Sequence, residues 1–595
     1  MNAEPLTLLP GAAFGVARSF TGRRWRLSEP DAAATAALAR DAAISPTLAR
    51  LLLARRIAAA DVPDYLNPTL KRFLPEPLSL KDMDKAVART AEALVRGEKI
   101  AVWGDYDVDG STSAALLYQF FSALGQPPRL YIPDRMTEGY GPNAPGLLRL
   151  KDEGVSLVIT VDCGAGAVAP LAAARDAGLD VVVLDHHAVE AAPPAVAHVN
   201  PNQPGDASGL GHVCAAGITF LFAVALNRVL RDSGFYENKG IAPPDLRDAA
   251  DLVGLATVCD VVPLVGVNRA FVRTGLARLS RLERTGFAAL AGVAKIQPPF
   301  TPYHLGFLFG PRINAGGRVG RASLGVELLT SLDPATAEEL ALSLDTHNRE
   351  RQAIEKLILE EAVALSQHQA NAPFVLAANE GWHAGVVGIV AGRLKDRFNK
   401  PAFVAGFEGG LGRGSARSIP GVDIGAMVRA AREANLIESG GGHGMAAGFG
   451  LRPDQLEGFR AFLEERFAHA DEALVAALDL DLDVAVSPAG ATAALVEEIA
   501  QAGPFGAGNA EPLVAVPDVQ VTFADIVGKD HLRLRLTGGD GARLDAIAFR
   551  SAALPLGKAL LQSRGRRIHA AGRLRADAWQ GQTRVQLQLE DAAAA

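Results

Sequence analysis

Short apolar runs rich in β-branched residues recur between residues 98 and 199. They cover residues 98–104, 129–133, 157–161, 180–184 and 196–199. The runs are continuous rather than alternating, which is typical of strands that are covered on both faces. Helical patterns precede or separate them, for example over residues 86–96 and 111–124. The pattern therefore predicts an α/β domain with a parallel sheet and crossover helices.

The pattern changes further along the chain. Residues 213–330 are predicted to be mostly helical, and Asp333-Pro334 is a good start for a long helix that reaches about residue 369. Strand patterns return at 374–377 and 402–405, with a helix between them, which predicts a second α/β domain. From residue 479 onward, short strands separated by turn signals predict a small β-barrel, of the kind seen in OB-folds: 479–486, 513–515, 519–523, 532–536, 546–549, 568–574 and 583–589.

Composition narrows the class of protein. A chain of 595 residues predicts three or four domains, and 21% charged with 49% hydrophobic residues is typical of globular proteins. The net charge of −7 excludes a broadly basic surface, so any nucleic acid must bind in a local groove. Three cysteines without CxxC spacing exclude a disulfide framework or a cysteine zinc site. We expect a cytoplasmic protein with no secretory signal, no membrane span and no P-loop motor.

Three aspartates follow the first strand at alternate positions. Asp105, Asp107 and Asp109 lie between the run at 98–104 and the predicted helix at 111–124. Ionised carboxylates beside a buried strand need partners because desolvation is costly, and a divalent cation would satisfy all three. An alternative is a polar turn whose aspartates cap the following helix.

Other predicted strands end in similar side chains. Asp162 follows the run at 157–161, and Asp185-His186-His187 follows the run at 180–184. Ligands of parallel sheets bind beyond the carboxyl ends of the strands, so these groups should converge on one rim. Asp260, after an apolar helix, is either a further ligand or a buried hydrogen-bonded group. Such a set suits two cations about 3.5–4 Å apart, and the imidazole favours manganese over magnesium.

Three glycine-rich stretches carry polar side chains. The stretch 310–318 is predicted to be a loop in which two arginines grip phosphates, or else an ordinary flexible loop. In 414–418 and 440–443, small residues would let a ligand approach Ser415, Arg417 and His443, although hairpin glycines are the alternative. Phe505, within 504–509, could stack on a base or pack in a core.

These motifs resemble a known family. Asp105–Gly110, Val161-Asp162, Asp185-His186-His187 and Asp260 resemble the four motifs of the DHH phosphoesterases, and Gly381–Gly385 with Gly440–His443 resemble the accompanying DHHA1 domain. Gly104–Gly110, Gly310–Ala315, Gly414–Pro420 and the stretch 504–509 narrow the resemblance to bacterial single-strand-specific exonucleases of this superfamily, from about residue 45 to the C-terminus.

The resemblance implies an architecture and an activity. The fold class would be α/β, in this order along the chain: an N-terminal segment (1–45), a parallel-sheet DHH domain (46–332), a long connector helix (333–370), a DHHA1 α/β domain (371–472) and a C-terminal OB-fold β-barrel (473–595). The activity would be 5′→3′ degradation of single-stranded DNA to 5′-mononucleotides by two-metal-ion hydrolysis, in DNA repair and recombination. Implied cofactors are two divalent cations, Mn²⁺ or Mg²⁺. Implied partners are single-stranded DNA, a single-stranded-DNA-binding protein and a RecQ-type helicase, with the chain acting as a monomer away from membranes.

The resemblance also implies roles for residues. Metal ligands would be Asp105, Asp107, Asp109, Asp162 (bridging), His186 and Asp260. Groups near the scissile phosphate would be His187, oriented by Asp185, together with Arg312 and His443. The 5′-phosphate and the strand would be bound by Arg135, Ser415, Arg417, Asn314, Arg318 and Phe505. Trp103 stands where many smaller DHH enzymes have a histidine ligand, and Asp105 is the candidate replacement.

Two rival functions remain open at this point. One is a phosphatase or a hydrolase of short oligonucleotides, which would have no use for a strand-binding barrel. The other is a non-catalytic replisome scaffold on a decayed DHH core, and the intact acidic motifs argue against it.

Overall fold

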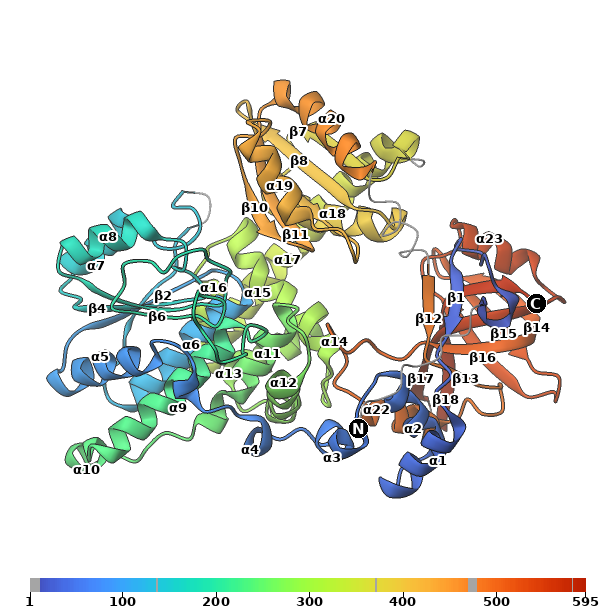
Figure 1. The fold of residues 1–595 in the computed structure, drawn as a ribbon, viewed down its shortest axis with the longest axis horizontal. Coiled ribbons are helices and arrows are strands. Elements are labelled where there is room, and N and C mark those ends of the chain that lie inside the picture. The colour runs from blue at the N-terminus through green and yellow to red at the C-terminus, as the bar shows by residue number, and fades with distance from the viewer. Residues whose placement is uncertain (1–10, 135–136, 370–371, 469–478, 580–581) are drawn as a thin grey trace. The chain divides into compact units, whose positions relative to one another are not determined.

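The computed structural model describes residues 11–134, 137–369, 372–468, 479–579 and 582–595 (Figure 1). The chain forms two compact units. The first, here the α/β unit, comprises Asn67–Ala353 and Pro504–Ala510. The second, here the composite unit, comprises Met1–Leu66, Ile354–Gly503 and Glu511–Ala595. Each unit is described by itself.

A five-stranded parallel sheet organises the α/β unit. Its strands are β2 (Ile100–Gly104), β3 (Arg129–Tyr131), β4 (Leu157–Val161), β5 (Asp180–Leu184) and β6 (Ala197–Val199), in the order β3-β2-β4-β5-β6. Every residue of β2 and β4 is buried, which confirms the prediction of strands covered on both faces.

Helices cover both faces of this sheet (Figure 1). On one face, Ile100 and Val102 join a core with α5 (Met83–Arg96), α6 (Val108–Ala123) and α9 (Ala215–Asp232). On the other face, Ala101 and Trp103 join a core with α7 (Ala144–Asp152) and α8 (Val168–Asp176). The alternation follows from the two-residue repeat of a strand.

The rest of the α/β unit is helical, as predicted. Its helices are α4 (Leu70–Phe73), α10 (Phe235–Lys239), α11 (Ala250–Cys259), α12 (Gly266–Leu279), α13 (Thr285–Ala294), α14 (Pro302–His304), the π-helical turn η5 (Leu305–Phe309), α15 (Gly310–Val319), α16 (Leu324–Thr330) and the first part of α17 (Pro334–Ser366). Helix α17 begins as expected, because Asp333 Oδ2 accepts a hydrogen bond from the Thr336 amide at 2.9 Å. Among the described residues, no helix is long and apolar enough to cross a membrane.

The prediction of a loop at 310–318 is wrong. These residues form α15, which continues the helical turn η5 without a break. Leu305, Phe309 and Ile313 are fully buried at helical spacing, and this packing offsets the low helix propensity of the glycines. Pro311 lies in the first turn of α15, where proline is tolerated.

In the composite unit, a second sheet has the order β10-β11-β9-β8-β7. Its elements are β7 (Val375–Glu380), α18 (Ala384–Phe398), β8 (Ala402–Glu408), β9 (Leu411–Arg417), α19 (Ile424–Glu433), β10 (Ser439–His443), β11 (Ala446–Leu451) and α20 (Leu456–Phe467). Residues of α18 and the end of α17 pack on one face, and residues of α19 and α20 pack on the other. The end of α17 therefore packs on this second sheet.

The C-terminal region is a β-barrel, as predicted. Its strands are β13 (Val484–Ala485), β14 (Val514–Val527), β15 (His531–Thr537), β16 (Arg543–Ala548), β17 (Arg567–Trp579) and β18 (Gln582–Ala594), and the β14–β17 pairing closes it. Helices α22 (Ala493–Gln501) and α23 (Pro555–Gln562) accompany them. The predicted separate strands at 513–515 and 519–523 are one strand, β14, in which the register with β17 shifts between Val516 and Val519. A bulge bends a strand without ending it.

The N-terminal residues pack on the barrel. Strand β1 (Arg24–Leu27) pairs in parallel with β12 (Asp479–Leu482). Trp25 is fully buried, and its Nε1 donates to Asp591 Oδ2 at 2.9 Å. The short helices α1 (Ala32–Asp41), α2 (Pro46–Ala54) and α3 (Val62–Leu66) follow β1.

Candidate metal centre and phosphate-contacting groups

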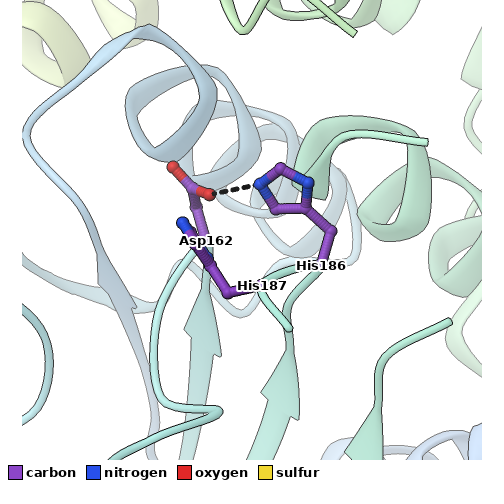
Figure 2. Close-up of side chains that lie close together, drawn as sticks. All are labelled: Asp162, His186 and His187. Atoms are coloured by element: carbon purple, nitrogen blue, oxygen red, sulfur yellow. Dashed lines mark ion pairs between the residues drawn. The ribbon is translucent and has the colours of Figure 1, made fainter. Parts of the chain in front are cut away.

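The acidic and imidazole side chains of the α/β unit come together at one edge of its sheet. Asp105 and Asp107 follow β2, Asp109 lies in the first turn of α6, and Asp162 follows β4. His186 and His187 follow β5, which neighbours β4 in the sheet. Figure 2 shows the Asp162 carboxylate facing the ring of His186, with His187 beside them. The rim predicted from the strand ends is therefore present.

His186 lies at the middle of this cluster. Its Nε2 is 3.4 Å from Asp162 Oδ1, 3.7 Å from Asp260 Oδ2 and 3.9 Å from Asp109 Oδ2. Ligand atoms within 4.8 Å of one another form three overlapping sets: Asp105/Asp107/Asp162, Asp162/His186/His187 and Asp109/His186/Asp260. Asp162 belongs to two sets, and so does His186. This overlap is what two neighbouring cations with shared ligands require.

Burial makes the carboxylates hard to ionise. Asp109 and Asp162 are 1% and 3% exposed. Burial, followed by repulsion from neighbouring carboxylates, raises the pKa of Asp109 to about 7 and that of Asp260 to about 9. The same causes raise the pKa of Asp162 well above its usual range. Without a cation, it is therefore unfavourable for all of these carboxylates to be ionised at the same time.

Asp185 fixes the orientation of His187. Its Oδ1 lies 2.7 Å from His187 Nδ1 and accepts the amides of His186 and His187, while its Oδ2 accepts the Ala165 amide at 3.0 Å. Burial lowers the pKa of His187, but the hydrogen bond and charge of Asp185 outweigh this and raise it to about 9. Burial would raise the pKa of Asp185, yet its bond to His187 holds that pKa below its usual range.

The capping role considered for the aspartate turn is also present. Asp107 Oδ1 accepts the Gly110 amide at 3.0 Å at the start of α6. Asp109 is held by the first amides of α9, since its oxygens accept from Ala215 at 2.7 Å and from Ala216 at 2.8 Å. One carboxylate oxygen can accept an amide and still bind a cation, so capping and metal binding are compatible.

Gly110 gives a stability prediction. A Cβ atom there would lie 2.5 Å from the carbonyl oxygen of Asp105 and 2.6 Å from its amide nitrogen. We expect Gly110→Ala to lower the free energy of unfolding by about 2–3 kcal/mol, because rigid backbone must move. Denaturant unfolding of the variant would measure this. Gly166→Ala is the matched control, since a Cβ there meets nothing within 4 Å; equal stability of the two variants would contradict the prediction.

The sequence patterns did not identify several residues that the structure places at the rim. Asn200 and Asn202 follow β6, the fifth strand, and their Nδ2 atoms donate to the carbonyls of His187 at 2.8 Å and His186 at 2.6 Å. Tyr140 Oη donates to the Asp162 carbonyl at 3.1 Å. The asparagines could have been found with the rule that identified the aspartates, because they too follow a parallel strand.

Trp103 does not belong to the rim. It is fully buried in the core that the sheet forms with α7 and α8, and its ring stacks on Tyr131 with centroids 4.2 Å apart. Gly146 in α7 leaves room for the ring. Asp105, the candidate replacement for the histidine ligand, lies in the set with Asp107 and Asp162.

The residues at the rim fit a divalent cation. Asp260 Oδ2 is buried and has no hydrogen-bond partner among the described residues. Ligands about 2.1 Å from an octahedral cation lie roughly 3 Å from one another, so the His186 distances would need only small adjustments. Oxygen ligands with one or two imidazoles suit manganese or magnesium.

The arginines of α15 have other partners close by. Arg312 Nε donates to Asp345 Oδ1 at 3.0 Å, and its Nη1 donates to the Leu308 carbonyl at 2.8 Å. Asn314 Oδ1 accepts the Val108 amide at 3.1 Å, which joins α15 to the aspartate turn. Arg318 is half-buried in the last turn of α15. Arg135 lies outside the described residues.

Phe505 lies in the segment 504–510, which belongs to the α/β unit rather than to the barrel. The Ala507 carbonyl accepts the Leu264 amide at 2.7 Å, four residues after Asp260. Gly508 has φ +67°, and a Cβ there would lie 2.9 Å from Pro263. Phe505 itself is half-buried.

Ser415, Arg417 and His443 share one face of the composite unit's sheet. Arg417 pairs with Ala446, which pairs with His443, and directly paired residues project to the same side. Arg417 Nη1 donates to Ser415 Oγ at 2.8 Å. A Cβ at Gly388 in α18 would lie 3.0 Å from Ser415 Oγ, so this glycine allows α18 to approach both side chains. We call Ser415, Arg417 and His443 the polar trio.

Comparison with known domain families matches three parts of the chain. Residues 99–257 match the DHH family N-terminal domain, residues 371–469 match the DHHA1 domain, and residues 482–591 match the RecJ OB domain.

Comparison with individual proteins gives long matches. The chain is 33% identical over 578 residues to the single-stranded-DNA-specific exonuclease RecJ of Bacillus subtilis, covering 96% of this chain and 71% of that protein. It is 35% identical to the Salmonella typhimurium RecJ, covering 88% and 92%. The crystal structure of Thermus thermophilus RecJ with Mn²⁺ superposes with a TM-score of 0.79 at 29% identity, covering 96% of this chain and 79% of that one.

Proposed function

Because this chain belongs to the RecJ family of single-stranded-DNA-specific exonucleases, we propose that it hydrolyses single-stranded DNA from the 5′ end and releases 5′-mononucleotides. Its role would be in DNA repair and recombination. The observation that carries the proposal is the rim, where the His186 ring lies among the carboxylates of Asp109, Asp162 and Asp260, and the potential ligand atoms of each set lie within 4.8 Å of one another. A decayed scaffold would lack this set.

The cofactors are divalent cations. Solved RecJ structures carry Mn²⁺ or Mg²⁺, and the donor set here suits both. Asp105, Asp107, Asp109, Asp162, His186 and Asp260 would hold them, with Asp162 shared. When bound, two such cations lower the pKa of a water molecule and offset charge on the phosphoryl oxygens.

The protein's own residues orient the reacting groups. Asp185 holds His187 by Nδ1, which leaves Nε2 as the ring atom able to contact a phosphate oxygen. Asn200 and Asn202 fix the backbone that carries both histidines. These contacts would reduce the reorganisation needed when charge develops on the scissile phosphate, and preorganisation of this kind lowers the barrier. Arg312 would act near this phosphate if it exchanged Asp345 for the substrate.

The polar trio would set the direction of degradation by binding the 5′-terminal phosphate. A terminal phosphate carries more negative charge than an internal one, and a guanidinium beside a hydroxyl can bind it through several charge-assisted hydrogen bonds. Arg417 and Ser415 would hold this phosphate, and His443 would contact the strand nearby. Arg135 is also proposed to bind a phosphate of the strand. Asn314 and Arg318 would contact the strand along α15, and Phe505 would stack on a base.

The barrel would bind the trailing strand through backbone charge and stacking, without reading base identity. We further propose that the enzyme acts as a monomer in the cytoplasm, together with a single-stranded-DNA-binding protein and a RecQ-type helicase that supplies single strands. Pull-down of each partner with the purified chain would test these associations.

One experiment tests the activity. Single strands labelled at the 5′ or the 3′ end are incubated with the protein and MnCl₂. We expect labelled mononucleotide to appear at once from the 5′ label and only late from the 3′ label, and EDTA to stop both. Cleavage of dinucleotides alone would favour the short-oligonucleotide hydrolase. Strand binding without any cleavage would favour the scaffold.

A further inference from the structure

Two large aromatic side chains are exposed on one surface of the α/β unit. Tyr303 in α14 is 61% exposed and Phe307 in η5 is 65% exposed. Their rings stack on each other, with centroids 5.0 Å apart and an angle of 24° between the planes. Stacking uses one face of each ring, so the pair still presents aromatic surface to solvent.

The hydrophobic core does not account for this pair. On the same helical run, Leu305 and Phe309 are fully buried and supply the packing against the unit. Leu and polar side chains would serve equally well at exposed helical positions. An exposed apolar surface formed by two stacked rings is typical of a binding site.

The helical run that carries the pair packs against residues beside the metal-centre rim. Cys259 Sγ, beside Asp260, donates to the Leu305 carbonyl at 3.5 Å. A Cβ at Gly310 would lie 2.4 Å from the same sulfur, so this glycine permits close packing. Further along, Asn314 contacts the aspartate turn.

The distance from the pair to the rim suits a bound strand. Residues 302–319 form one continuous helical run. Phe307 and Asn314 are seven residues apart, which is roughly 10 Å along such a run. A strand whose phosphate lies at the rim would therefore have bases within reach of the rings. The π-helical turn at Phe307 is itself of a kind that is frequent at functional sites.

We propose that Tyr303 and Phe307 form a stacking platform for a nucleobase of the single strand held at the metal centre. The proposal rests on the proposed function, because it takes the substrate to be single-stranded DNA. Unpaired bases expose their faces, and aromatic side chains bind those faces whatever the base identity. The platform would fix the strand beside the rim and would exclude duplex DNA, whose bases are stacked on one another.

The test combines variants with abasic substrates. Tyr303→Leu, Phe307→Leu and the double variant keep apolar, helix-compatible side chains and remove the rings. Leu332→Ala, in the same unit and 88% exposed, is the matched control. Equilibrium binding of labelled strands is measured by fluorescence anisotropy in MnCl₂, with phosphorothioate linkages to prevent hydrolysis, so that the metal centre stays loaded. Each strand carries one abasic nucleotide, placed at successive positions from the 5′ end.

For the wild type, we expect one or two abasic positions to weaken binding by about 5- to 150-fold. The double variant should bind the intact strand that much more weakly and should not respond to an abasic nucleotide at those positions. Leu332→Ala should match the wild type, and all variants should keep the wild-type melting temperature.

Wild-type affinity of the double variant would overturn the proposal. So would weak binding that keeps the wild-type response to every abasic position, because the rings would then act elsewhere, for example on another part of the chain. Failure of the proposed function is separate: it would appear as absence of cleavage by the wild type in MnCl₂, whatever the variants bind.

Discussion

Asp162→Asn is expected to abolish hydrolysis of single-stranded DNA and, at the same time, to stabilise the metal-free protein. Asp162 belongs to two of the three potential ligand sets, so its loss would weaken both cation positions. We expect hydrolysis to fall by at least about a thousandfold, since the charge offset at the phosphate depends on both cations.

The opposite effect on stability follows from the pKa of Asp162. An acid whose pKa is raised by folding ionises less readily in the folded chain, so above its unfolded pKa its charge lowers the free energy of unfolding. Burial and four neighbouring carboxylates raise this pKa. Asn has the same shape without the charge. We expect the metal-free variant to gain about 1–2 kcal/mol, or roughly 2–6 °C in melting temperature.

Calorimetry and a nuclease assay measure the two effects. MnCl₂ should raise the melting temperature of the wild type by mass action and should leave that of the variant nearly unchanged. Asp152→Asn removes an exposed carboxylate from α7 and is the control; it should change neither property. A variant that retains wild-type hydrolysis would remove Asp162 from the metal centre.

The parallel sheet and the rim could be predicted from the sequence because both depend on local patterns. Continuous Val-rich runs identify strands buried on both faces, and the residue after each run lies at the carboxyl edge whatever the rest of the fold. Asp105, Asp162 and His186 were found in this way. Asn200 follows the same rule, but a neutral amide has no charge that must be compensated when it is buried, so the argument that identifies the aspartates does not identify it.

Contacts between distant residues could not be predicted. Arg312 pairs with Asp345, 33 residues later, and Arg24 pairs with Asp479, 455 residues later. Nothing in either segment alone indicates its partner. The helix at 310–319 was missed for a related reason: its glycines suggest a loop, and it is stabilised by tertiary burial of Ile313 and Phe309 rather than by propensity.

If the polar trio holds the 5′-phosphate as proposed, Arg417→Ala is expected to remove a preference for 5′-phosphorylated strands. Arg417 donates to Ser415 Oγ and to the Ala416 carbonyl, so its guanidinium is held beside a hydroxyl on the face shared with His443. Gly388 allows α18 to pack closely against both side chains, because a Cβ there would lie 3.0 Å from Ser415 Oγ. A charge-assisted contact to a phosphate is worth about 1.5–3 kcal/mol. We expect kcat/KM on 5′-phosphorylated strands to fall by about 10- to 150-fold, with little change on 5′-hydroxyl strands.

Two further variants separate this role from general binding of DNA. Arg413→Ala removes an exposed guanidinium from the same strand, four residues earlier; if Arg417 binds the terminal phosphate, Arg413→Ala should affect both substrates equally and weakly. Arg417→Lys keeps the charge but loses the planar fork, so part of the preference should return. Equal loss on phosphorylated and hydroxyl ends in Arg417→Ala would mean that this residue contacts the strand elsewhere, and that the direction of degradation is set by other groups.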